Sequence, residues 1–94
     1  MIVHGSRDSG ELRSAFEEIR ALAPASTMEI ADLADDNAIG AMFKRCIRVD
    51  ALINNAATQN PSPFVDLKEA DWDRILAVNL KAPFLCAQAS RPEL

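Results

Sequence analysis

The chain reads Asp-Ala-Leu-Ile-Asn-Asn-Ala-Ala over residues 50–57, an apolar triplet that two asparagines stop and two alanines follow. A short apolar run bounded by turn residues is typical of a buried strand. Two similar runs lie earlier in the chain, at residues 2–4 and 27–31, and a helical pattern lies between successive runs. Strands that alternate with helices indicate βαβ units, a parallel sheet and an α/β fold.

Two helices are predicted from the spacing of apolar residues. In the first, apolar side chains recur at steps of three and four from Glu11 until Pro24 ends the pattern, and Ser9 or Asp8 can cap its start. The second follows the polar turn at residues 32–37. Its apolar positions are Ile39, Met42, Phe43 and Cys46 or Ile47.

Residues 66–90 are predicted to be largely helical. Pro83 removes a backbone hydrogen bond when it lies deep inside a helix, so we expect a helix to about Val78, a break at Asn79 and a new helix with Pro83 in its first turn. On this helix three apolar side chains are expected to form core: Trp72, Ile75 and Leu76.

Composition narrows the classes of function. The 94 residues suit one small domain, and the net charge of −4 with no basic run argues against nucleic acid as a partner. No apolar stretch is long enough for a membrane span and no signal peptide is evident, so we expect a cytoplasmic protein without a membrane partner. Cys46 and Cys86 lack the spacing of metal ligands; we read them as buried thiols and expect no metal.

Polar residues follow each predicted strand, at residues 6–8, 32–33 and 54–57. In open parallel sheets, ligands bind beyond the carboxyl ends of the strands, so these groups are predicted to line one edge of the sheet. His4 lies within the first strand, where a lone histidine is usually packed or hydrogen-bonded. We therefore expect a structural role for His4 and no functional one.

Three segments together resemble one family. Residues 50–57 resemble the Asp-x-Leu-Ile/Val-Asn-Asn-Ala-Gly strand and turn of short-chain dehydrogenases/reductases, and residues 31–35 resemble the acidic turn after that family's third strand. Residues 71–84 resemble its helix with Trp, Val/Thr-Asn-Leu and Phe at fixed spacing. The segments occur in the family's order, and the resemblance covers nearly the whole chain.

The resemblance implies a fold. It implies that residues 1–94 form a partial NAD(P)-binding domain of Rossmann type, with a doubly wound parallel sheet. The chain would carry the family's second, third and fourth strands and the following helix. It would lack the first strand with its glycine-rich loop and the carboxy-terminal catalytic half. Residues 90–94 depart from the family's pattern, and a non-native tail is our hypothesis for them.

The resemblance also implies hydride transfer between NADP(H) and a small carbonyl or alcohol substrate. Arg7 matches the position where a basic side chain meets the 2′-phosphate of NADP, and a guanidinium pairs with phosphate bidentately. Asp8 lies one position later than the acid that would hold the ribose hydroxyls of NAD, so NADP is favoured and NAD stays possible. From the residues alone, Arg7 can equally be a solvated loop residue and Asp8 a helix cap.

The next two segments match cofactor contacts in the family. Asp32 and Leu33 match the pair that contacts adenine, although Asp32 can also simply organise the turn before the second helix. Asn55 and Ala56 match the turn whose backbone runs along the cofactor ribose. Ala57 replaces the family's usual glycine, which is mild unless the backbone there has a positive φ.

Asn79 is the one catalytic candidate. Its counterpart lies at a helix break where a freed carbonyl holds a water of the proton relay, and the plain alternative is a helix cap. The family's serine and its Tyr-x-x-x-Lys are absent, and the sequence contains no tyrosine, so we expect the isolated chain to be inactive and to self-associate. The alternative function is a non-catalytic α/β module that binds a protein partner through an open sheet edge.

Overall fold

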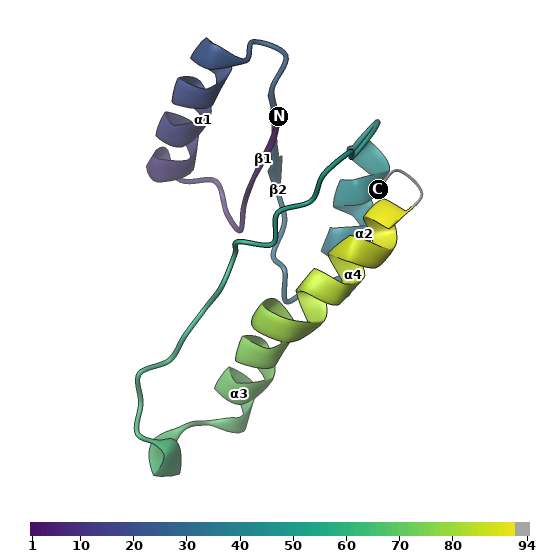
Figure 1. Ribbon diagram of the computed structural model, residues 1–94. Helices are drawn as coiled ribbons and strands as arrows, with labels where there is room; N and C mark the ends of the chain where they lie inside the picture. The colour runs from purple at the N-terminus through teal and green to yellow at the C-terminus, as the bar shows by residue number, and fades with distance from the viewer. Residues whose placement is uncertain (92–94) are drawn as a thin grey trace. The chain divides into compact units, whose positions relative to one another are not determined.

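The computed structural model describes residues 1–91 (Figure 1). The chain forms two compact units, Met1–Asp32 and Leu33–Leu94. Strands occur in the first unit, and the described part of the second is helical apart from its connecting segments. No helix in residues 1–91 is both long and apolar enough to cross a membrane.

The first unit is a strand–helix–strand unit. It consists of β1 (Ile2–Gly5), α1 (Gly10–Leu22) and β2 (Thr27–Ile30). The two strands pair in parallel, with Ile2 opposite Thr27 and Gly5 opposite Ile30. Parallel strands need a crossover connection, which α1 supplies. The predicted parallel βαβ arrangement is therefore confirmed, with strand ends within one residue of those expected from the sequence.

Helix α1 starts at a side-chain cap and packs on β1. The Ser9 hydroxyl accepts a hydrogen bond from the Leu12 backbone N–H at 3.1 Å, so of the two predicted caps Ser9 is the one used. The Leu12 side chain fills the space above Gly5, where an added Cβ would lie 2.5 Å from Leu12 Cδ2. A glycine at position 5 thus allows the helix to approach the strand closely.

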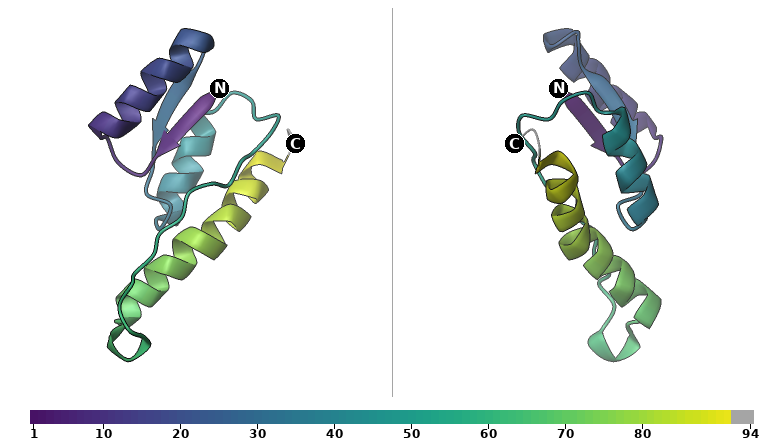
Figure 2. Two further views of the ribbon diagram at one scale, coloured as in Figure 1. Left: turned by 60° about the vertical axis from the view of Figure 1, so that its left-hand side comes forward. Right: turned by 90° about the vertical axis from the view of Figure 1, so that its right-hand side faces the viewer.

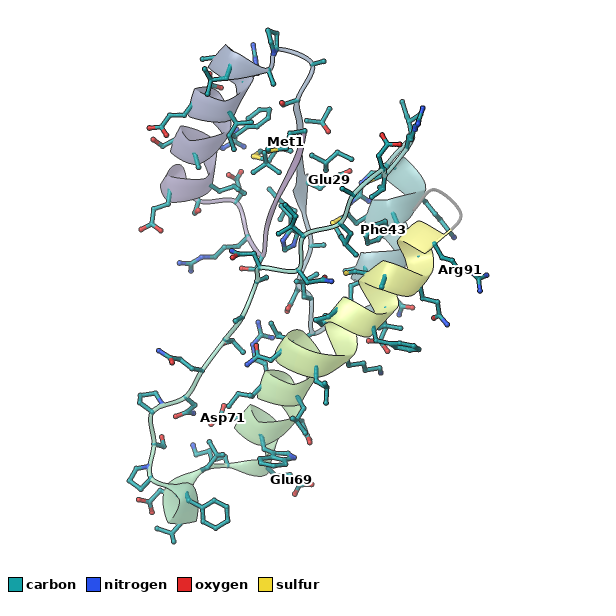
Figure 3. All side chains as sticks on the ribbon, viewed as in Figure 1. Met1, Glu29, Phe43, Glu69, Asp71 and Arg91 are labelled. Carbon is teal, nitrogen blue, oxygen red and sulfur yellow. The ribbon has the colours of Figure 1, made fainter. Side chains whose placement is uncertain are left out.

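The second unit is built around α2 (Asp36–Arg45) and α4 (Ala82–Ser90). Asp35 caps α2, because its carboxylate accepts from the backbone N–H groups of Asn37 and Ala38 at 3.0 and 3.3 Å. Between the two helices lies a small apolar core. Its buried members are Ile39, Ala82 and Cys86, and the half-buried side chains packed on it are Leu33, Phe43, Leu52 and Leu85. Figure 3 shows Phe43 projecting from α2 beside α4.

Helix α4 is the last part of one continuous helical run. It comprises α3 (Glu69–Leu76), the π-helical turn η2 (Ala77–Lys81) and α4, and it appears unbroken in both views of Figure 2. The predicted break at Asn79 is wrong, because the chain widens into a π turn there and continues helical. Pro83 lies in the first turn of α4, as predicted, where the missing N–H disturbs the helix least.

The prediction of a third strand at residues 51–53 is wrong. Within residues 1–91 the sheet contains β1 and β2 alone, and the segment from Ala51 to Asn60 has no regular secondary structure. A strand is stabilised by backbone hydrogen bonds to a neighbouring strand, and an apolar triplet does not supply them. Its side chains separate instead: Leu52 packs on the α2–α4 core and Ile53 is 85% exposed.

The predicted core face of the long helical run is wrong for Trp72 and Leu76, while Ile75 is half-buried. Trp72 is 51% exposed and Leu76 is 38% exposed. The buried positions of the run are smaller residues, each four residues from the next: Val78, Ala82, Cys86 and Ser90. Small side chains let α2 approach α4 closely. Of the larger apolar residues of the run, Leu85 packs on the α2–α4 core, whereas Leu80 and Phe84 are exposed.

The predicted non-native tail at residues 90–94 falls partly outside the described residues. Ser90 is the last residue of α4; it is buried, and its hydroxyl donates to the Cys86 carbonyl at 2.8 Å. Arg91 is exposed, and residues 92–94 lie outside the residues that the structure describes.

Candidate functional site

Two of the predicted site residues lie at the same edge of the parallel pair. Gly5 and Ile30 are paired in the sheet register and end their strands. Arg7 and Asp32 each follow two residues later, so both lie beyond the carboxyl ends of β1 and β2. This is the edge at which parallel α/β sheets bind ligands. The first unit thus brings these two residues to one edge, and their role in binding a cofactor stays a prediction.

A histidine fixes the backbone at this edge. The ring Nε2 of His4 lies 2.8 Å from the carbonyl oxygen of Ala31, and the Ala31 backbone N–H donates to the Gly5 carbonyl at 3.1 Å. The two bonds hold the peptide that immediately precedes Asp32. The structural interpretation of His4 is therefore confirmed, and its contribution is to position the neighbouring acid.

The turn between β1 and α1 contains an ion pair that was not predicted. The guanidinium of Arg13 donates from Nε to Asp8 Oδ1 and from Nη2 to Asp8 Oδ2, both at 2.7 Å. This hydrogen bonding, together with the charge of Arg13, holds the pKa of the Asp8 carboxyl below its ordinary value. The two residues are five apart and Asp8 precedes the helix, so the sequence carries no spacing signal for the pair.

Arg7 lies beside this pair and is exposed. Its guanidinium forms no ion pair with any residue in the described range 1–91. A cationic side chain of this kind, next to an acid that is already paired, can bind an anion from solution.

The two residues predicted at adenine differ in their surroundings. Asp32 is half-buried and ends the first unit. Leu33 is half-buried too, but it packs against the α2–α4 core. Its side chain therefore has a structural role that the sequence did not indicate.

Asn79 joins the helical run to the segment after residues 50–57. Its Oδ1 accepts from the Thr58 backbone N–H, and its Nδ2 donates to the Thr58 carbonyl, both at 2.8 Å. The side chain thus satisfies both backbone groups of a residue outside regular structure. Thr58 was not predicted as a site residue. The signal was Asn79 itself, because asparagine is a poor residue for a helix interior unless its side chain has a partner.

A shallow, open hollow lies against Thr58. It measures about 410 Å³ and is lined by Ala57, Thr58 and Gln59. Asn55 and Ala56 precede it and are exposed. No non-glycine residue in the described chain has a positive φ, so Ala57 is accommodated without backbone strain in the position of the family's glycine.

The structure thus forms two groups of candidate residues, one in each unit. Arg7, Asp8 and Asp32 lie at the strand ends of the first unit. Asn79 and the segment around Thr58 lie together in the second. The predicted alignment of Asn55 with Arg7 and Asp32 along one edge stays a prediction.

Neither cysteine lies in these groups. Cys86 is part of the α2–α4 core, and burial raises the pKa of its thiol. Cys46 is half-buried and donates from Sγ to the Met42 carbonyl at 3.4 Å. Neither is placed as a nucleophile would be.

Comparisons with known proteins identify the family of this chain. The family model described as short chain dehydrogenase matches residues 1–94. The chain is 35% identical over 92 residues to a (2S)-((R)-hydroxy(phenyl)methyl)succinyl-CoA dehydrogenase subunit, BbsD, of Thauera aromatica, covering 94% of this chain and 37% of that protein. It is 32% identical over 94 residues to the 3-oxoacyl-(acyl-carrier-protein) reductase FabG of Staphylococcus aureus, covering 96% of this chain and 37% of the reductase.

Among solved structures, a metagenomic short-chain oxidoreductase in complex with NADP superposes with a TM-score of 0.86 at 33% identity. The alignment covers 98% of this chain and 43% of that one. The chain therefore spans well under half the length of the relatives that it matches.

These matches correct one prediction and establish the family. They place the chain in the amino-terminal part of the family's fold, and β1 and β2 are the only strands in residues 1–91. The prediction that the chain holds the family's second, third and fourth strands and lacks its first is therefore wrong as made. With the family model matched from end to end, the chain belongs to the short-chain dehydrogenase family.

Proposed function

We propose that this chain forms part of the NADP-binding domain of an oxidoreductase that transfers hydride between NADP(H) and a small carbonyl or alcohol substrate. The observation that carries the proposal is the charge arrangement after β1. Arg7 is exposed and has no ion-pair partner in the described residues, while the neighbouring Asp8 is held by Arg13 at 2.7 Å. An exposed cation at the carboxyl end of a strand favours a phosphate over a free hydroxyl.

Each unit taken by itself has residues whose chemistry suits part of the adenosine half of NADP. Arg7 would pair with the 2′-phosphate and Asp32 would accept from the adenine amino group. The backbone at Asn55 and Ala56 would follow a ribose, since neither a large side chain nor a positive φ obstructs approach there. Leu33 would border adenine only through its backbone, because its side chain packs on the α2–α4 core.

For Asn79 we propose a role in the proton relay. A π turn leaves backbone carbonyls without their usual partners four residues on, and such turns often occur at functional sites. The side chain of Asn79 is occupied by Thr58, so the relay function would fall to a backbone carbonyl of η2. When bound, NADP(H) would supply the hydride.

The isolated chain is proposed to lack turnover. The family donates a proton from tyrosine, and this sequence has none. Binding of the nucleotide, rather than activity, is therefore the property to measure.

A second candidate function is association without catalysis. Large apolar side chains are exposed on the long helical run: Leu80 by 69%, Phe84 by 60% and Trp72 by 51%. Each strand also has one side without a partner strand in residues 1–91. Both features favour self-association or a protein partner.

The proposal is tested by titrating the chain with adenosine 2′,5′-bisphosphate and with 5′-AMP in a calorimeter. The wild-type chain should bind the bisphosphate at least about tenfold more tightly than 5′-AMP, because one charge-assisted contact to the phosphate contributes that difference in affinity. Arg7→Ala should abolish the preference. Arg20→Ala, an exposed arginine in the last turn of α1, is the matched control and should keep it. Equal affinity of the wild-type chain for the two ligands would overturn the proposal.

A further inference from the structure

We propose that Arg13 is a specificity-determining positioning residue, which makes the chain select NADP over NAD by holding the carboxylate of Asp8 away from the ribose. This inference rests on the proposed function, and it adds a residue on α1 that acts through another side chain.

The geometry leaves Asp8 little freedom. Each carboxylate oxygen accepts one hydrogen bond from the same guanidinium, Oδ1 from Nε and Oδ2 from Nη2. Two parallel bonds from a planar guanidinium fix both the position and the plane of the carboxylate. Arg13 is itself fixed at its backbone, since its N–H donates to the Ser9 carbonyl at 3.0 Å within the first turn of α1.

The pair has no capping role that would explain it. Ser9 already caps α1 through its hydroxyl, so Asp8 is not needed for that purpose. The pair is also exposed, with side-chain exposures of 61% for Arg13 and 51% for Asp8. Exposed ion pairs contribute little to stability. What remains is its effect on the neighbouring side chain, Arg7.

An unpaired Asp8 would oppose Arg7. A carboxylate in the turn that follows such a strand can accept hydrogen bonds from the ribose 2′-hydroxyl, which favours NAD, and it repels a 2′-phosphate. Paired with Arg13, the acid has its charge balanced by the guanidinium and its plane fixed toward α1, which weakens both interactions. The preference for the 2′-phosphate therefore depends on a residue that need not touch the nucleotide.

The test measures the ratio of the dissociation constants for 5′-AMP and adenosine 2′,5′-bisphosphate in the 94-residue chain and four variants. Arg13→Met should lower the ratio about tenfold, because a freed carboxylate then faces a doubly charged phosphate across a few Å of water. Asp8→Asn in the Arg13→Met background should restore it. Asp8→Asn alone should change it less than about twofold, since that carboxylate is already occupied. Arg20→Met on the same helix is the matched control.

Each alternative outcome is distinct. If the wild-type chain shows no preference, the proposed function fails and this inference with it. If the wild-type preference exists and survives Arg13→Met, only the inference fails. A loss in Arg13→Met that Asp8→Asn does not restore would make Arg13 a direct contact or a structural residue and would overturn the positioning role. If Arg13→Met does not fold, Asp8→Asn alone decides. A severalfold rise of the ratio in that variant would show that Arg13 does not hold the Asp8 carboxylate, and this would overturn the positioning role as well.

Discussion

Replacing Asn79 by alanine removes both hydrogen bonds between the helical run and Thr58. Each bond is 2.8 Å long, and both end on the backbone of Thr58. A neutral hydrogen bond contributes a net 0.5–1.5 kcal/mol, and because this pair is exposed we take the lower part of that range, which gives about 1–2 kcal/mol for the two. The segment around Ala57 and Thr58 should then detach locally while α3 and α4 persist.

Amide hydrogen exchange of Thr58, followed by NMR, measures this detachment directly. A loss of about 1–2 kcal/mol corresponds to exchange that is about 5- to 30-fold faster. Asn79→Asp should be intermediate, because a carboxylate still accepts from the Thr58 N–H but repels the Thr58 carbonyl. Asn60→Ala is the matched control: Asn60 Oδ1 accepts from the Ser62 N–H at 3.0 Å in the same segment and does not bond Thr58. We call the two hydrogen bonds between Asn79 and Thr58 the Asn79–Thr58 clamp. Unchanged exchange of the Thr58 amide in Asn79→Ala would refute it.

Three further predictions concern charge, thiol reactivity and association. The pKa of Asp8 lies below its ordinary value of 3.8, so the stabilising effect of the Asp8–Arg13 pair is present above that pH and is lost as the pH falls through the lowered pKa. The NMR shifts of the carboxyl carbon should show the Asp8 titration move back up in Arg13→Met. An unchanged titration would contradict the pair. Because burial raises the pKa of the Cys86 thiol, Ellman's reagent at pH 8 should modify the half-buried Cys46 first, and equal rates would mean that the α2–α4 core is open. Leu80→Glu should lower the average mass in sedimentation equilibrium, since it places a charge among the exposed apolar side chains; an unchanged mass would assign association to another surface.

The local features of the fold could be predicted because they depend on neighbours in the sequence. Pro24 and Ser9 bound α1, and Pro83 lies in the first turn of α4 as its fixed φ requires. The parallel pairing of β1 with β2 followed from the intervening helix. Such rules involve only residues close in the chain.

The errors arose where distant residues decide the outcome. Residues 51–53 have the composition of a strand, yet a strand also needs a backbone partner. Trp72 was expected in the core because it shares one side of the helix with Ile75 and Leu76, but the helix packs through Ala82 and Cys86, which permit a closer approach. The interruption at Asn79 was located correctly and described wrongly, since a π turn and a break share the same sequence signal.

The site was predictable to a similar extent. Arg7 and Asp32 follow strands, and a parallel register brings both to one edge. The Asp8–Arg13 pair and the Asn79–Thr58 clamp depend on side-chain directions that periodicity does not encode. Leu33 shows the reverse case, since its match to the family motif did not reveal its packing on the α2–α4 core.

The central claim is that the carboxyl ends of β1 and β2 bind the phosphorylated ribose of NADP. The most direct measurement is the set of ¹⁵N–¹H shifts of the chain titrated with adenosine 2′,5′-bisphosphate. We expect the amide signals of residues 5–9 and 31–33 to move. Those of residues 5–9 should move far less with 5′-AMP, and Arg7→Ala should remove this difference. Signals that stay still at these residues, or that respond equally to both ligands, would contradict it.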